Sequence, residues 1–222
     1  MINALIAGDI ETFLISLLLS LPIVFLALSV HETAHGYAAY RLGDPTAKNL
    51  GRLTLNPAKH IDPIGFLCML LFGFGWAKPV PINTRYFKKP KRDMALTGLA
   101  GPLSNVLLAL VFAILLRVAL QFGYGMVNTE LAFSIFQWTL IFLEMGVRMN
   151  VTLAVFNLIP VPPLDGSRIF LVLLPSETYF KIMRYERYIY IALMVALAFG
   201  LLNGPIDFVS DLVLRLIYNI AF

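Results

Sequence analysis

The stretch TFLISLLLSLPIVFLALSVHETAHGYAAY, residues 12–40, decides the fold of this chain. Its residues 12–30 carry no charge, and such a run approaches the roughly 20 apolar residues that a helix needs to cross about 30 Å of hydrocarbon. A helix from Thr12 to Tyr40 would be about 43 Å long, which exceeds the membrane core. The sequence therefore predicts a first transmembrane helix whose last turns carry the polar group His31 to His35.

The composition of the whole chain indicates a membrane protein. Of its 222 residues, 59% are hydrophobic and 14% are charged, whereas soluble domains average about 45–50% apolar and about 25% charged residues. The excess apolar surface needs lipid as its solvent, and a signal peptide does not explain it because apolar segments recur to the end of the chain. The single cysteine, Cys68, excludes an intrachain disulfide and a thiolate-rich metal site. No segment resembles a nucleic-acid-binding module.

Three further long apolar segments predict additional membrane helices. They are Met94–Leu116, Tyr188–Ile206 and Leu131–Leu164, the last interrupted by Glu144 and Arg148. Each is close to the length of a membrane span or exceeds it.

Two other apolar segments leave their relation to the membrane open. Pro63–Ala77 is short, which favours a re-entrant or interfacial segment. Pro205–Phe222 carries Asp207, Asp211 and Arg215 at helical four-residue spacing. This pattern fits either a weak span or a helix that lies in the membrane interface.

The basic residues predict the orientation of these spans. Between Arg41 and Arg92 lie ten of the seventeen Lys and Arg residues, against the acidic residues Asp44 and Asp62. The positive-inside rule places this connection in the cytoplasm. A five-span path then puts the N-terminus outside and, if the tail crosses, the C-terminus inside.

Two parts of the basic connection predict short β-strands near the cytoplasmic surface. Ala47–Leu55 alternates in character around Gly51, and Lys78–Tyr86 is extended by Pro79 and Pro81. The expected fold is therefore an all-α polytopic membrane protein with about five transmembrane helices, these short strands and a broken, re-entrant-like segment.

The group His31-Glu32-Thr33-Ala34-His35 has the spacing of a metal site on a helix. Side chains at i and i+4 share a helix face, so two imidazoles placed in this way can bind one Zn²⁺. Glu32 lies about 100° around the helix axis, where it can reach a metal-bound water as a general base. Two of the three histidines of the chain lie here, and polar clusters at membrane depth are functional candidates by default.

A third ligand is expected from the segment Asn157–Gly166. Pro160, Pro162 and Pro163 prevent a continuous helix there. Broken backbone at membrane depth is tolerated where protein or a water-filled cavity satisfies its polar groups. Asp165 follows this break and can turn its carboxylate toward the metal.

These motifs resemble those of the site-2 protease family of intramembrane zinc metalloproteases. The family combines an H-E-x-x-H helix, a later Asn-Pro-Leu-Asp-Gly segment and a Gly-Pro-x-x-Asn stretch between them. This chain has His31–His35, Asn157–Gly166 and Gly101–Asn105 in that order, and the resemblance covers about residues 20–175. The chain resembles a minimal form without a PDZ or nucleotide-sensing domain.

The resemblance implies the roles of the site residues. His31, His35 and Asp165 would bind one Zn²⁺, Glu32 would be the catalytic acid and base, and Asn157 would be a polar residue of the active site. It also implies substrates that are membrane proteins with a transmembrane helix, a location in the lipid bilayer of a prokaryotic cell membrane, and an active site toward the cytoplasm. The whole of residues 1–222 is expected to form one membrane-embedded domain, with a catalytic core at about 12–175 and C-terminal helices at 186–222.

Several roles stay open at this point. Asn157 or Asn105 could stabilise the oxyanion, and Asn105 also belongs to a stripe of small residues that favours helix packing. His60 and Asp62 could orient a ligand or close a loop, and Glu144 would be the third ligand in a different metalloprotease plan. A non-proteolytic metal-binding protein or transporter is the alternative function, although no internal repeat supports transport.

Overall fold

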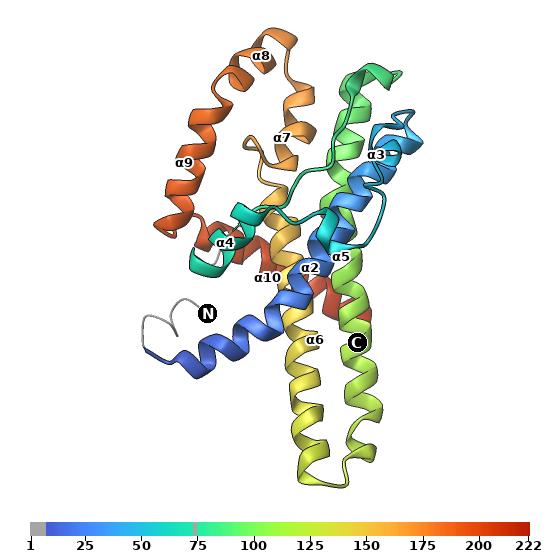
Figure 1. The fold of residues 1–222 in the computed structure, drawn as a ribbon, viewed down its shortest axis with the longest axis vertical. Helices are drawn as coiled ribbons and strands as arrows, with labels where there is room; N and C mark the ends of the chain where they lie inside the picture. Colours follow the sequence, from blue (N-terminus) through green and yellow to red (C-terminus); the bar gives the residue numbers. More distant parts are fainter. Residues whose placement is uncertain (1–7, 73–74) are drawn as a thin grey trace.

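The computed structural model describes residues 8–72 and 75–222, and these residues are almost entirely helical. Three long helices form the centre of the molecule: α2 (Ile10–Arg41), α5 (Pro90–Phe122) and α6 (Glu130–Asn157). Helices α5 and α6 run side by side as a long hairpin, and α2 crosses both of them at an angle (Figure 1). Among the described residues, these three helices are long and apolar enough to cross a membrane. The expectation of a polytopic helical membrane protein holds, but the expected count of five spans is not supported.

Local capping signals set the ends of these helices. The side chain of Asp9 accepts a hydrogen bond from the backbone N–H of Thr12, at 3.0 Å, and so caps the start of α2. Pro90 occupies the first turn of α5, where a missing N–H costs nothing. Thr129 caps α6 through a hydrogen bond from Ala132 N, at 3.1 Å. The long apolar runs of the sequence therefore become helices with defined starting points.

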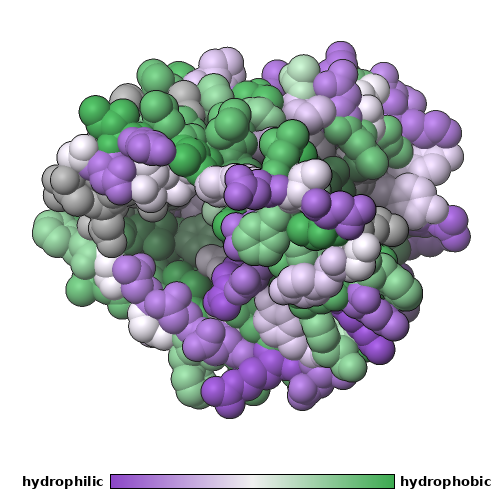
Figure 2. Space-filling model, turned by 90° about the horizontal axis from the view of Figure 1, so that it is seen from below, coloured by the Kyte–Doolittle hydropathy of each residue, from purple (hydrophilic) through white to green (hydrophobic). Residues whose placement is uncertain are grey.

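The buried core lies where α10 (Asn203–Ala221) packs against the α5–α6 hairpin. Its members are apolar side chains of these three helices: Ala109, Phe112, Ala113, Leu116, Leu143, Val147, Val151, Val155, Ile206, Leu214, Ile217 and Ala221. Large apolar side chains such as Leu18, Leu107 and Ile135 are exposed, as a lipid-facing surface requires. Seen from below in Figure 2, hydrophobic side chains gather mainly on one side of the molecule, around a hollow.

The two predicted strands do not form, and that prediction was wrong. Within the described parts of the chain, β-pairing is limited to one isolated bridge between Ile61 and Ala77. Ala47–Leu55 instead begins in the short helix α3 (Thr46–Asn49) and folds back through a turn at Gly51, where φ is 63°. The N–H groups of residues 49–52 are paired locally, and Thr54 O accepts from the side chains of Thr33 and His60, so these groups are not offered to a neighbouring strand.

Lys78–Tyr86 is not part of a sheet, and two of its amides bond to side chains outside the segment. Val80 N donates to Glu32 and Asn83 N donates to Asp44. Pro79 and Pro81 have no N–H to contribute to a ladder. The segment ends in a 3₁₀ turn at Thr84–Tyr86.

The uncharged run Tyr188–Ile206 is divided between two helices, so the prediction of a single span there was also wrong. Helix α9 (Glu186–Ala198) ends before Gly200, whose φ is 68°, and α10 starts at Asn203. Glycine adopts this left-handed conformation without steric cost. The turn at Gly200 therefore separates two helices in a run that hydropathy alone predicts to be one span.

The remaining elements surround the three long helices. The expected short membrane segment Pro63–Ala77 begins as α4 (Pro63–Phe72), and its residues 73–74 lie outside the described residues. Helix α6 ends at Asn157 and α7 (Asp165–Phe170) begins at Asp165, so the predicted break at the prolines is confirmed. The other helices and 3₁₀ turns are Pro57–Lys59, Tyr124–Met126, Leu171–Leu173 and α8 (Ser176–Arg184).

Candidate metal centre

Three ligand atoms from two distant parts of the chain converge between the long helices. His31 and His35 lie on adjacent turns of α2, and Asp165 is the first residue of α7. The two Nε2 atoms are 3.0 Å apart, and Asp165 Oδ2 lies 3.0 Å from the first and 2.9 Å from the second. All three side chains are buried, with exposed fractions of 5%, 4% and 7%. The structure thus brings together the three residues that the sequence singled out as metal ligands.

The outer nitrogen of each imidazole contacts an oxygen that accepts a hydrogen bond. His35 Nδ1 lies 2.7 Å from the backbone oxygen of Thr97, which can only accept. His31 Nδ1 lies 2.6 Å from Asn105 Oδ1. The orientation of that amide follows from its Nδ2, which donates to the backbone oxygen of Ala27 at 3.2 Å. Both Nδ1 atoms therefore carry a hydrogen, so in the neutral imidazoles both Nε2 atoms present lone pairs to the centre of the site.

This arrangement fits a metal cation. With neutral imidazoles, two Nε2 lone pairs and a carboxylate oxygen face one another, and one divalent cation satisfies all three. Tetrahedral coordination with bonds of about 2.0–2.1 Å would place such ligand atoms about 3.3 Å apart, close to the separations of 2.9–3.0 Å between His31, His35 and Asp165. The donor set of two imidazoles and one carboxylate matches catalytic zinc sites, which leave a fourth position open.

Small residues of α5 make room for this centre. A Cβ atom at Gly101 would collide with the imidazole rings of both His31 and His35. Helix α5 can therefore approach α2 only because it carries glycine at this turn.

The second carboxylate oxygen of Asp165, Oδ1, lies 3.7 Å from the guanidinium of Arg168 on the next turn of α7.

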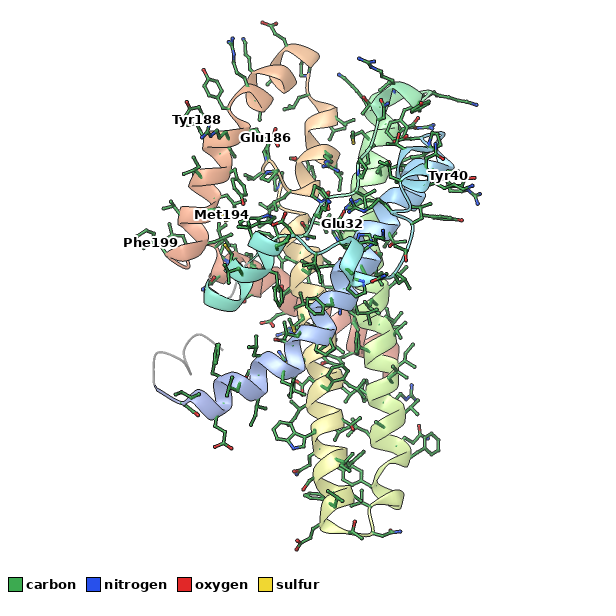
Figure 3. All side chains as sticks on the ribbon, in the orientation of Figure 1. Glu32, Tyr40, Glu186, Tyr188, Met194 and Phe199 are labelled. Atoms are coloured by element: carbon green, nitrogen blue, oxygen red, sulfur yellow. The ribbon has the colours of Figure 1, made fainter. Side chains whose placement is uncertain are left out.

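Glu32 is buried next to His31 and is held by the connection between α2 and α5. Its Oε2 accepts a hydrogen bond from Val80 N at 2.7 Å, and Figure 3 shows its side chain where the extended segment crosses α2. Arg52 donates to the backbone oxygen of Lys78 at 2.7 Å, and Asp44 accepts from Asn83 N at 2.6 Å. The contact of Glu32 holds the segment against the helix that carries the histidines, and the other two hold it against residues that follow this helix.

The other predicted site residues have contacts of different kinds. Asn105 is fully buried and uses its side chain to orient His31. Asn157 donates to Leu153 O within α6 at 2.9 Å. Glu144 forms an exposed ion pair with Arg148, away from the three convergent ligands.

His60 and Asp62 have structural contacts. His60 Nε2 donates to Thr54 O, and Asp62 accepts from the N–H groups of Ile64 and Gly65 at the start of α4. Of the two roles left open for these residues, loop closure is the one that these contacts support.

Three contacts of the site were missed by the sequence reasoning. They come from the backbone oxygen of Thr97, from Arg168, and from Asn150, which is fully buried on α6. A polar residue within a membrane helix is itself a signal of a functional site, so Asn150 could have been singled out. A backbone carbonyl has no sequence signal.

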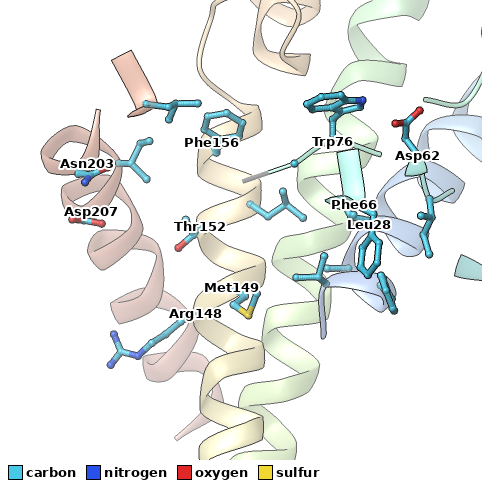
Figure 4. A pocket seen from close by; sticks show the side chains of 18 residues that line it. Leu28, Asp62, Phe66, Trp76, Arg148, Met149, Thr152, Phe156, Asn203 and Asp207 are labelled. Atoms are coloured by element: carbon cyan, nitrogen blue, oxygen red, sulfur yellow. The ribbon is translucent and has the colours of Figure 1, made fainter. Parts of the chain in front are cut away.

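A cavity of about 520 Å³ lies between α2, α4, α6 and α10. Figure 4 shows Leu28, Phe66, Met149 and Phe156 among the mainly apolar side chains that line it. Leu28 precedes His31 by about one helical turn on α2, and the three convergent ligands are not among the residues that line the cavity.

The fold and the site together define a class: a helical membrane protein with a buried centre for one metal ion. The sequence profile of Peptidase family M50 matches residues 18–202. The chain therefore belongs to this family, which is the site-2 protease family that its motifs resemble.

Relatives from bacteria support this assignment. "Putative zinc metalloprotease YwhC" of Bacillus subtilis is 43% identical over 172 residues, which cover 78% of this chain and 76% of that protein. A protein described in the same way, Rip2 of Mycolicibacterium smegmatis, is 31% identical over 64% of this chain and 51% of its own length. No solved structure matches this chain. The chain is a metalloprotease, and its cofactor is zinc.

Proposed function

We propose that this metalloprotease hydrolyses peptide bonds within or beside transmembrane segments of other membrane proteins. His31, His35 and Asp165 hold the zinc ion in this proposal, and Glu32 is the general base. The observation that carries it is the convergence of three lone-pair atoms, 2.9–3.0 Å apart and buried among apolar helices. A metal centre at this depth serves a substrate that reaches it from the membrane.

The chemistry divides between the ion and the side chains around it. Zinc, when bound, polarises the substrate carbonyl and lowers the pKa of water toward about 7. Glu32 takes the proton from the attacking water and passes it to the leaving amine, a role worth about 10²–10⁴-fold in rate. Its hydrogen bond from Val80 N orients the carboxylate for this transfer.

Asn157 is the better candidate for the oxyanion donor. The side-chain amide of Asn105 already forms hydrogen bonds with Ala27, Asn150 and His31. Asn157 lies at the end of α6, directly before the broken segment that leads to Asp165, and its NH₂ group has a second hydrogen beyond the one donated to Leu153. One such donor contributes about 2.7–4 kcal/mol to catalysis.

The apolar cavity supports a membrane-derived substrate. Its lining of Leu28, Phe66, Met149 and Phe156 suits aliphatic and aromatic side chains, because burial of apolar surface is favourable. The ten basic residues between Arg41 and Arg92 support a site toward the cytoplasm. Bacterial and archaeal relatives support the cell membrane of a prokaryote as the location.

Three variants test the proposal. Glu32→Gln is expected to keep zinc bound but to lose about 10²–10⁴-fold in peptide cleavage. Asp165→Asn is expected to weaken zinc binding itself, because it removes a charged ligand. Glu144→Gln is the matched control and retains both properties, since Glu144 is exposed and paired with Arg148. Full cleavage by Glu32→Gln, or loss of zinc in Glu144→Gln alone, would refute the assignment.

A further inference from the structure

The amide of Asn150 continues the hydrogen bonds of the metal centre onto a third helix. Asn150 is fully buried on α6, and its Nδ2 donates to Gly146 O at 2.8 Å. Its Oδ1 accepts from Asn105 Nδ2 at 3.1 Å. Asn105 in turn accepts from His31 Nδ1 at 2.6 Å. An unbroken series of contacts thus runs from the backbone of α6 through α5 to α2.

Two backbone oxygens fix the direction of every hydrogen bond in this series. Gly146 O and Ala27 O can only accept. The NH₂ group of Asn150 must therefore face Gly146, which turns its oxygen toward Asn105. Asn105 must likewise direct both of its hydrogens to Asn150 and Ala27, which leaves its oxygen for His31.

His31 depends on side chains for its orientation, whereas His35 does not. His35 Nδ1 donates to a backbone oxygen of α5, at Thr97, which is held by the helix itself. His31 Nδ1 donates to a side-chain amide whose position depends on its own partners. Without Asn150, one N–H of the buried Asn105 loses its acceptor, and such groups are rarely left unpaired in folded proteins.

We propose that Asn150 is a positioning residue for zinc binding, which holds Asn105 in the orientation that aligns His31. This proposal rests on the proposed function in one respect, because it takes His31 as a zinc ligand. Residues behind a metal ligand typically change metal affinity by about 10–100-fold when they are replaced.

The experiment measures zinc affinity of the full-length chain in detergent by competition with a chelator. Asn150→Leu, which keeps the branched shape of the side chain but removes the amide, is expected to weaken zinc binding about 10–100-fold. Val147→Ala is the control, because Val147 is fully buried on the same helix and belongs to the apolar core. It is expected to lower the melting temperature of the zinc-free protein and leave zinc affinity within about threefold.

A double-mutant cycle separates positioning from packing. If Asn150 acts through Asn105, Asn150→Leu is expected to have little further effect, within about threefold, in an Asn105→Leu background. An equal loss in both backgrounds would overturn the proposal, because it would indicate a general effect on helix packing. An unchanged zinc affinity in Asn150→Leu would also overturn it. If the leucine variant does not fold, Asn150→Ala provides the same comparison without added volume.

The Asp165→Asn variant keeps this test distinct from the proposed function. Unchanged zinc binding in Asp165→Asn would show that the ligand set is wrong. Weak zinc binding in Asp165→Asn together with normal binding in Asn150→Leu would refute only the role of Asn150.

Discussion

The two halves of α5 differ in the side chains that they bury against the rest of the molecule. Near the metal centre its buried residues are small or polar, as at Thr97, Gly101 and Asn105. Farther along, its buried residues are apolar, as at Phe112 and Leu116. The outward face is apolar in both halves, with exposed residues that include Leu103, Leu107, Val111, Leu115 and Val118.

This difference shows that lipid and chemistry constrain different faces of one helix. The outward face must match hydrocarbon everywhere, so it contains little information about function. The inward face changes from close-packed and hydrogen-bonded at the metal centre to a simple apolar core beyond it. Substitutions on the inward face near the metal centre should therefore affect zinc, and those elsewhere should affect stability or nothing.

The largest effect is expected from Gly101→Ala. The added Cβ would collide with both imidazoles, so the helices must separate or the ligands must rotate. We expect zinc affinity to fall by about 5–150-fold, since overpacking a dense site typically costs about 1–3 kcal/mol. Zinc content and chelator competition measure this effect.

Gly204→Ala is the matched control for that substitution. A Cβ at Gly204 would meet nothing within 4 Å, so this variant is expected to bind zinc as the wild type does. Equal zinc affinities for the two alanine variants would contradict the close approach of α5 to the histidines.

Gly146→Ala tests the apolar part of the hairpin. Its Cβ would collide with the ring of Phe112 across the α5–α6 contact. The free energy of unfolding is expected to fall by about 1–3 kcal/mol, measured by chemical denaturation in detergent. Adding Phe112→Leu should recover part of this loss, because the smaller side chain relieves the overlap. A greater loss in the double variant would argue against this contact.

A smaller effect is expected from Thr33→Val, inside the zinc motif but facing away from the metal. Thr33 Oγ1 donates to Thr54 O at 2.7 Å, and the same oxygen also accepts from His60. Because the oxygen keeps one donor, the loss should be only about 0.5–1.5 kcal/mol of stability. Zinc affinity measured on the same samples should stay at the wild-type value. Loss of zinc would show that the connection to Thr54 positions the histidines.

The smallest effect is expected from Val118→Leu on the outward face of α5. Val118 is 47% exposed, and the change keeps the face apolar. We expect a change of less than about 0.5 kcal/mol in the free energy of unfolding and none in zinc affinity. A larger change would indicate that this face packs against protein rather than lipid.

The sequence predicted the parts of the site that depend on local geometry. The i, i+4 spacing of His31 and His35 places them on one face of any helix, and the prolines before Asp165 break any helix. The sequence did not predict how the connection between α2 and α5 pairs its backbone, because Val80 and Asn83 bond to side chains far away in sequence. Alternation and extension are compatible with a strand, but a partner strand is also required.

The sequence by itself determined that this chain needs a membrane, carries a two-histidine metal motif and breaks its backbone before a distant aspartate. Spacing, hydropathy and proline geometry are properties of the chain before it folds. Only the tertiary structure decided that the side chain of Asn105 bonds to His31 and that the side chain of Asn150 bonds to Asn105. Such hydrogen bonds join residues 74 and 45 positions apart, and the packing of three helices brings their partners within reach.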